Sequence, residues 1–220
     1  MDTWEYNNSN AKRRKIKKEE EYDEESNYSD IMPSSIGGLF GSSHDIRREG
    51  NNIYFYGSVT KSNMLELTML LKAVEKDNRK TAFNNNIDVP KIYLHINSYG
   101  GSIFAAFAFI DAIQKCTVPV VSIIEGCAAS AATMISIVCD ERQITEHSYM
   151  LIHELSSGVW GKYSEIEEEF NNLKKMMKMI KDLYKKHTKI KMSELDKCLK
   201  KDVWWTAKEC LQYGLVDEIN

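Results

Sequence analysis

The sequence contains no closely spaced pair of cysteines, which removes the usual signature of a structural zinc site. Its five cysteines are scattered and odd in number: Cys116, Cys127, Cys139, Cys198 and Cys210. Such a set also argues against a disulfide framework, so we expect reduced thiols in a cytosol-like, cytoplasmic compartment. Cys127 lies beside the serine motif described below, where we interpret it as a small buried apolar residue.

Net charge is also nearly absent, because 29 Lys and Arg oppose 32 Asp and Glu and leave a formal charge of -3. The balance gives no overall attraction to nucleic acid or to a membrane, and we expect neither as a partner. The N-terminus lacks the apolar core of a secretory signal peptide. Residues 118–139 are nearly apolar, but Glu125 and Gly126 interrupt the run. We therefore expect a buried strand leading into a buried helix rather than a transmembrane segment.

Residues 1–45 differ in composition from the rest of the chain. The basic run "KRRKIKK" at 12–18 is followed at once by the acidic run "EEEYDEE" at 19–25. A basic run alone is typical of a nuclear-import or nucleic-acid arm, but here the charges cancel locally, and the acidic run disfavours a mitochondrial transit peptide. We predict a charged, disordered N-terminal tail or propeptide at 1–45 and one folded domain at 46–220.

From residue 52 onward, strand-like and helix-like patterns alternate. The patterns predict strands at 53–57, 91–96, 119–125 and 149–154, and helices at 62–77, 103–115, from 164 and from 206. Ser62 and an S-x-x-E capping box at Ser164 and Glu167 are the expected helix starts. Residues 79–90 are interpreted as a polar loop. Strands alternating with crossover helices predict an α/β fold.

The long helix from Ser164 carries an apolar seam at alternating four- and three-residue steps. The seam consists of Ile166, Phe170, Leu173, Met177, Ile180 and Tyr184. A seam of this kind packs either against another subunit or against its own domain, and periodicity alone does not separate the two.

The stretch "IEGCAASAATM" places Ser130 among very small side chains at an expected strand-to-helix junction. Small neighbours let a polypeptide backbone approach, and the free N–H groups of a helix start can face a substrate oxygen. Gly100 and Gly101, just past another strand, are candidates for a second oxyanion donor. Tight packing of a small-residue helix and an ordinary glycine turn are the structural alternatives for these two motifs.

A serine needs a positioned base before it becomes a nucleophile. Among the five histidines, His44 falls in the tail, His187 near a helix end, His95 within a strand and His147 in a polar loop. His153 ends an apolar strand, where a side chain emerges at a sheet edge, and is the best candidate base. For the carboxylate that would orient it, spacing leaves Asp182, Asp196, Asp202 and Asp217 open.

Four segments, in this order, resemble the proteolytic subunit of the Clp protease: "IYLHINSYGGS", "IEGCAASAATM", "YMLIHE" and "YGLVDEI". The resemblance covers roughly residues 53–219. It implies a crotonase/Clp-protease-like fold of repeated ββα units with a protruding handle helix. It also implies a Ser-His-Asp serine endopeptidase that forms an acyl-enzyme.

Residue by residue, the resemblance implies that Ser130 is the nucleophile and His153 the general base. It selects Asp202, in "KKDVWWTA", as the orienting carboxylate. The oxyanion donors would be the backbone N–H groups of Gly101 and Ala131. Substrate would lie extended between segments 101–103 and 154–158, with binding residues Gly100, Ser102, Ile103, Glu154 and Leu155. Several positions differ from the family pattern: Tyr99 replaces a proline, Ala131 a methionine, and "HEL" at 153–155 stands where "HQP" is common.

The resemblance further implies assembly and partners. The helix at 164–187 corresponds to the handle that joins two stacked heptameric rings. A Clp-type ATP-driven unfoldase would feed unfolded polypeptides into the chamber. The chain itself would need no metal or organic cofactor, because ATP is used by the partner.

Two other functions remain open at this point. One is a catalytically silent ring subunit that assembles with an active paralogue; the intact Ser130, His153 and Asp202 set argues against it. The other is a crotonase-like acyl-CoA enzyme, which shares the fold and uses catalytic glutamates. Glu125 and Glu154 are the glutamates near the motifs.

Overall fold

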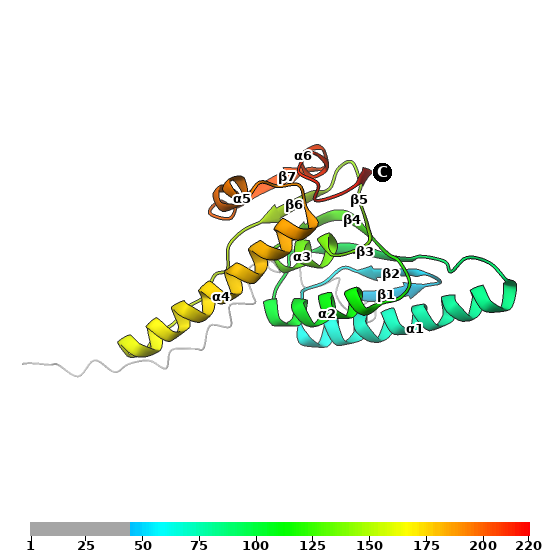
Figure 1. The fold of residues 1–220 in the computed structure, drawn as a ribbon, viewed down its shortest axis with the longest axis horizontal. Helices are drawn as coiled ribbons and strands as arrows, with labels where there is room; N and C mark the ends of the chain where they lie inside the picture. Colours follow the sequence, from blue (N-terminus) through cyan, green and yellow to red (C-terminus); the bar gives the residue numbers. More distant parts are fainter. Residues whose placement is uncertain (1–44) are drawn as a thin grey trace, which may run out of the picture. The chain divides into compact units, whose positions relative to one another are not determined.

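The computed structural model describes residues 45–220, and the predicted tail at 1–45 lies almost entirely outside them. Figure 1 shows the helices and strands of this part of the chain, which form one mixed α/β unit. The elements are β1 (Ile46–Glu49), β2 (Asn52–Phe55), α1 (Lys61–Asn85), β3 (Ile92–Ser98), α2 (Ile103–Lys115), β4 (Val120–Ala129), α3 (Ala131–Ile137), β5 (Glu141–Ile144), β6 (Tyr149–Ile152), α4 (Tyr163–His187), α5 (Met192–Cys198), β7 (Val203–Thr206), α6 (Ala207–Gln212) and β8 (Glu218–Ile219). The predicted α/β class is confirmed.

The strands form one sheet whose centre is parallel. Strands β2, β3 and β4 run parallel to one another, and β1 adds antiparallel at the edge. Strand β4 is long enough to pair twice, with β5 through residues 121–124 and with β6 through residues 127–129. Strand β8 continues the sheet beyond β5, and β7 lies antiparallel to β6. The forked end of β4 is the place where several strand ends come together.

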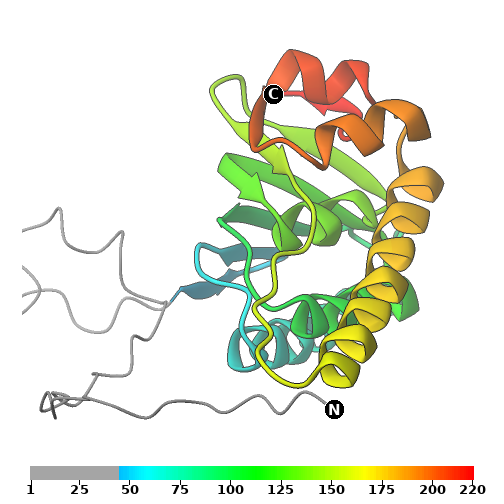
Figure 2. The same cartoon turned by 90° about the vertical axis from the view of Figure 1, so that its left-hand side faces the viewer.

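Continuous apolar runs explain why the central strands are buried. In β3 and β4, residues such as Ile92, Ile96 and Ile124 have no exposed surface, as expected for parallel strands covered on both faces. Helices α1 and α2 lie side by side along the sheet (Figures 1 and 2). Helix α3 packs on β4, and every one of its seven residues is buried. The run at 118–139 is therefore a strand and a buried helix, as predicted.

Helix α1 is longer than the sequence suggested. Its N-cap is Thr60, whose Oγ1 accepts from the Asn63 N–H at 3.2 Å, so the expected cap at Ser62 was wrong. The expected loop at 79–90 was also wrong over its first half, which continues the helix. No glycine or proline interrupts residues 61–85, and the helix stops only at Asn86, which adopts φ 51°.

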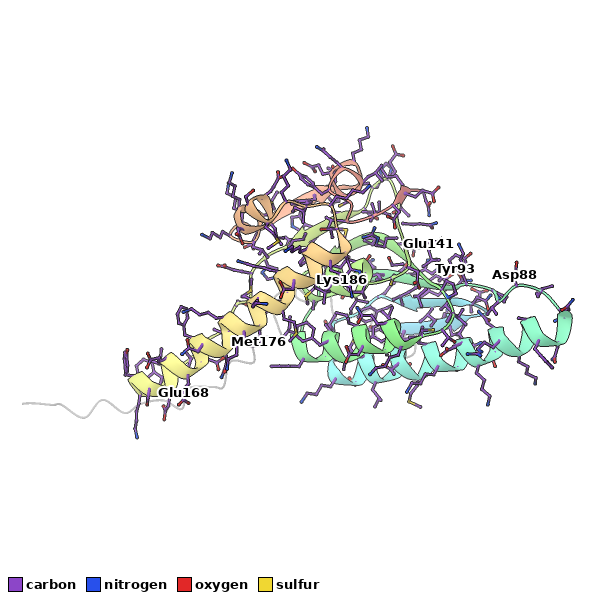
Figure 3. The ribbon with its side chains drawn as sticks, viewed as in Figure 1. Asp88, Tyr93, Glu141, Glu168, Met176 and Lys186 are labelled. Atoms are coloured by element: carbon purple, nitrogen blue, oxygen red, sulfur yellow. The ribbon has the colours of Figure 1, made fainter. Side chains whose placement is uncertain are left out.

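Helix α4 projects from the sheet, and only its last turns reach the core. Glu168 and Met176 lie on the projecting part, whereas Lys186 lies on the last turn (Figure 3). The capping carboxylate at its start is Glu165, which accepts from the Lys162 N–H at 2.8 Å. The predicted Ser164–Glu167 capping box was therefore wrong by two residues.

Different parts of the apolar seam of α4 fit the two interpretations, packing against the chain's own domain and packing against another subunit. Ile180 and Tyr184 are buried against the chain's own domain, at 4% and 2% exposure, whereas Ile166 and Phe170 are exposed.

All five cysteines are free thiols. Across residues 45–220, no helix combines the length and the apolar character needed to cross a membrane.

Candidate active site

Ser130 occupies the turn between β4 and α3 with an unusual backbone conformation. Its φ is 55° and its ψ is -125°, a region that costs a non-glycine residue about 1–3 kcal/mol. Its N–H donates to the Leu151 carbonyl at 2.9 Å, which ties the turn to β6. Ser130 is the N-cap residue of α3, yet its side chain makes no capping hydrogen bond. The hydroxyl is thus presented by a strained turn and is not used by the helix.

The glycine turn at 100–101 lies directly on the Ser130 turn. Gly100 adopts φ 97°, and a Cβ there would stand 2.6 Å from the Ala129 carbonyl oxygen and 2.7 Å from Ser130 Cβ. Only glycine fits both the conformation and the space. The two turns are therefore packed against each other with no side chain between them.

Gly101 follows Gly100 and Ala131 follows Ser130, so the two residues predicted to supply the oxyanion donors adjoin the two packed turns. Gly101 pairs with Val59 through the Gly100 carbonyl and the Ser102 N–H, at 2.7 and 2.8 Å. This pairing does not use the Gly101 N–H. Ala131 is the first residue of α3, where N–H groups have no partner within the helix. Both residues line the cleft described below.

Sheet register brings His153 to Ser130. In the parallel pair β4–β6, Ala129 stands opposite Leu151, so Ser130 and His153 both follow the carboxyl ends of neighbouring strands. The segment after His153 is fixed because the Glu154 N–H donates to the Leu199 carbonyl at 2.8 Å. The imidazole is partly exposed, with 29% of its side-chain surface accessible.

The antiparallel pair β6–β7 places Asp202 beside His153. Ile152 stands opposite Val203, and continuing the register by one residue sets Asp202 opposite His153. The distance from His153 Nδ1 to Asp202 Oδ1 is 3.9 Å, and the Asp202 side chain is 82% exposed. This separation is longer than a hydrogen bond, so the carboxylate must move closer to hold the imidazole.

The other three candidate aspartates are engaged elsewhere. Asp182 pairs with Lys178 at 2.7 Å, and Asp196 pairs with Lys181 at 2.7 Å. Asp217 forms a bidentate pair with Arg142 at 2.6 and 2.9 Å, whose hydrogen bonds hold the pKa of this carboxyl below its ordinary value. Of the four aspartates that spacing left open, Asp202 is the one whose carboxylate lies beside His153.

Ser130 and His153 line a cleft of about 280 Å³. Its wall includes Gly101, Ala131, Ser102, Ile103, Glu154 and Leu155, all of which the sequence had singled out. Gly100 lies beneath the cleft, against Ser130. The structure thus brings the predicted nucleophile, base, donors and substrate-binding residues together, with Asp202 at the outer side of the base.

The apolar floor of the cleft was not recognised from the sequence. It consists of Met134, Ile180 and Tyr184, which are 3%, 4% and 2% exposed. Ile180 and Tyr184 were noticed as seam residues of α4. Two features of the sequence could have located Ile180 and Tyr184 at the cleft. They are four residues apart on one helix face, and the small residues of α3 allow a neighbouring helix to pack closely.

Cys127 is poorly suited to act as a nucleophile in place of Ser130, and Glu125 is poorly placed to act as a catalytic carboxylate in the cleft. Burial raises the pKa of the Cys127 thiol, which favours the unreactive protonated form. Glu125 is bound by His95 Nδ1 at 2.9 Å and by the Tyr56 hydroxyl, and it does not line the cleft. Burial and the bond to Glu125 raise the pKa of Tyr56 to about 12. His95 is a buried residue of β3, where its ring stacks on Tyr54.

The fold and the cleft together define an α/β protein with a serine, a histidine and two backbone N–H groups around one groove. Comparison with known proteins agrees with this class. The family model for Clp protease matches residues 51–220. The chain belongs to the Clp protease family, which confirms the predicted family and the fold that goes with it.

Curated relatives carry the same family name. Proteolytic subunit 2 of the ATP-dependent Clp protease from Treponema denticola is 37% identical over 130 residues, covering 58% of this chain and 65% of the relative. Proteolytic subunit 1 from Chlamydia caviae is 34% identical over 128 residues, covering 56% and 67%. Subunit 1 from Protochlamydia amoebophila is 31% identical over 128 residues, covering 56% and 62%. The chain thus spans about two thirds of the length of these relatives.

Proposed function

We propose that the chain is a serine endopeptidase that hydrolyses unfolded polypeptides as the proteolytic subunit of a Clp-type protease. Family membership supports the serine-peptidase class. The observation that carries the proposal is the Ser130 turn, strained at φ 55° and facing a cleft that His153 also lines. A strained turn persists where function requires it and packing over-determines it.

In the proposed reaction, Ser130 Oγ attacks a peptide carbonyl while His153 takes its proton. The developing oxyanion accepts hydrogen bonds from the N–H groups of Gly101 and Ala131. His153 then protonates the leaving amine, and the C–N bond breaks to leave an acyl-enzyme. His153 next takes a proton from water, whose oxygen attacks the ester carbonyl, and returns a proton to Ser130 Oγ as the C–O bond breaks and the acid is released. Asp202 holds the imidazole tautomer once it closes the 3.9 Å gap.

The cleft favours an extended peptide with an apolar side chain at the cleavage point. Residues 101–103 and 154–156 both line the cleft, and we expect a substrate strand to add between segments 101–103 and 154–158. The apolar floor formed by Met134, Ile180 and Tyr184 favours an aliphatic or aromatic side chain. Ser102, Ile103, Glu154 and Leu155 would contact the residues on either side.

The projecting helix α4 supports an assembly of several copies. Ile166 and Phe170 on α4 are 42% and 55% exposed in the single chain, and a second copy would cover them. We propose two stacked heptameric rings joined by this helix, with a Clp-type unfoldase supplying unfolded chains. ATP would be used by that partner, and the chain itself would require no metal or organic cofactor. Its free thiols fit a reducing cytoplasm.

The silent-subunit and acyl-CoA functions are less well supported. A silent subunit has no need to place a serine, a histidine and two donors around one groove. An acyl-CoA enzyme would need a glutamate at the reacting centre. Glu125 is held by His95 and Tyr56 away from the cleft, whereas Glu154 does line it, so the family match is what disfavours this function. Tight binding of CoA would restore that candidate.

The proposal is tested with fluorogenic peptides and an unfolded protein such as casein. Wild type and Ser130→Ala are first sized, so that both are compared as assembled rings. Hydrolysis by wild type and its loss in Ser130→Ala support the proposal, and mass spectrometry of the products gives the cleavage preference. An assembled wild type that cleaves neither substrate would favour the silent ring subunit.

A further inference from the structure

A buried hydrogen-bond chain links the projecting helix α4 to the Ser130 turn. Thr133 is fully buried on α3, one turn after the serine, and its Oγ1 donates to the Ser130 carbonyl at 2.6 Å. The Thr133 N–H donates to the same carbonyl at 3.1 Å. The Tyr184 hydroxyl of α4 is hydrogen-bonded in turn to Thr133 Oγ1. Two donors of Thr133 therefore converge on the backbone carbonyl of the candidate nucleophile, and the Tyr184 hydroxyl contacts one of these donors.

The direction of this chain follows from counting protons. A threonine hydroxyl carries a single proton, and here that proton goes to the Ser130 carbonyl. Tyr184 must therefore donate to Thr133 Oγ1. Burial raises the pKa of the Tyr184 phenol above its ordinary value, so the phenol keeps its proton at any working pH. Donors in series polarise one another and strengthen the last bond of the chain.

We infer that Thr133 and Tyr184 are positioning residues that hold the Ser130 turn in its reactive conformation and couple it to the seating of α4. The inference rests on the proposed function and extends it to residues that do not touch the scissile bond. Ser130 has no capping bond of its own, and its φ of 55° is held only by its surroundings. A carbonyl fixed by the Thr133 hydroxyl limits rotation of the peptide unit that Ser130 and Ala131 share. That peptide unit carries the Ala131 N–H.

The alternative is that the phenol merely satisfies its hydrogen bond and contributes to stability. Tyr213 offers a matched control, because its hydroxyl donates to Glu194 at 2.7 Å outside the cleft. Tyr184→Phe and Tyr213→Phe each remove one hydroxyl from an aromatic ring. Thr133→Val removes the middle hydroxyl, whereas Thr133→Ser keeps it.

The test measures kcat and KM on a fluorogenic peptide, the rate of fluorophosphonate labelling, and hydrogen exchange of the segment 130–134. We expect kcat and labelling to fall about tenfold in Tyr184→Phe and in Thr133→Val, with KM within about twofold. Thr133→Ser should have a kcat near that of wild type. The double variant Thr133→Val/Tyr184→Phe should lose no more kcat than Thr133→Val alone. Tyr213→Phe should lower thermal stability without changing kcat.

The outcomes separate this inference from the proposed function. If wild type is active and Tyr184→Phe matches it in kcat and labelling, the positioning role is wrong while the peptidase stands. If wild type neither cleaves nor labels, the proposed function fails and exchange decides alone. Faster exchange at 130–134 in Tyr184→Phe and Thr133→Val, but not in Tyr213→Phe, supports the positioning role. Equal exchange overturns it.

Discussion

His153 and Asp202 stand opposite each other at the end of the β6–β7 pair, with Nδ1 and Oδ1 3.9 Å apart. The relationship is set by strand register and not by a specific side-chain bond. The backbone places the Cα atoms of the two residues opposite each other, and the exposed Asp202 side chain can rotate to bring its carboxylate closer to the imidazole. Closure of this gap, by substrate or by a neighbouring subunit, would convert an open arrangement into a working triad.

Asp202→Asn should lower kcat about a hundredfold or more, because an amide cannot stabilise the imidazolium that forms during attack. KM should change little, since Asp202 lies outside the cleft. Asp196→Asn is the control, because its exposed pair with Lys181 contributes little. Steady-state kinetics on one peptide distinguishes the two. Equal activity of Asp202→Asn and wild type would remove Asp202 from the site.

Gly100→Ala should abolish probe labelling. A Cβ at Gly100 would meet the Ala129 carbonyl oxygen and Ser130 Cβ well inside contact distance, so the Ser130 turn must shift. Gly50→Ala is a matched control, because Gly50 also has a positive φ but nothing lies within 4 Å of the new methyl group. The control should lose about 1 kcal/mol of stability and keep its labelling rate. Similar behaviour of the two variants would contradict the close packing of the turns.

Asp217→Asn should destabilise the fold at neutral pH and less so in acid. The hydrogen bonds from Arg142 depress the pKa of Asp217. A carboxyl whose pKa is lowered by folding stabilises the folded state at pH values above its pKa in the unfolded chain. This contribution is lost as the pH falls through its pKa in the folded protein. The difference in melting temperature between wild type and Asp217→Asn should therefore shrink toward about pH 3. A difference independent of pH would mean that packing, not charge, is responsible.

Tyr99 and Trp204 should be energetically coupled. Their rings meet edge to face at 6.2 Å and connect the glycine turn to the strand that follows Asp202. A double-mutant cycle with Tyr99→Ala and Trp204→Ala, measured by denaturant unfolding, should give a coupling of about 0.5–1.5 kcal/mol. Strict additivity would show that the contact contributes nothing.

Local patterns were sufficient for the central elements. The helix at 103–115 was predicted to the residue, and the strands that precede Gly100, Ser130 and His153 were recognised from their apolar runs. Their ends were less accurate, because β4 continues to Ala129 beyond the predicted end at 125 and β6 stops at Ile152 before the predicted end at 154. These three strand ends are the part of the site that parallel pairing assembles. Hence the serine, the candidate base and the donors could be selected from sequence.

Non-local pairing was beyond the sequence. Strand β7 has only four residues, and its antiparallel register with β6, which brings Asp202 to His153, depends on contacts between distant segments. The extent of α1 was missed because residues 79–85 are mostly polar and were taken for a loop. The helix continues through them because they contain no glycine or proline. The burial of Tyr184 was missed because a seam does not reveal which of its turns finds a partner.

The most direct measurement is the intact mass of the protein after incubation with a fluorophosphonate, for wild type, Ser130→Ala and His153→Ala. Such a probe reacts with a serine only when base and oxyanion donors are assembled. We predict one adduct per chain on wild type and none on either variant. An assembled wild type that stays unlabelled, or a Ser130→Ala variant that still gains the adduct, would contradict Ser130 as the nucleophile.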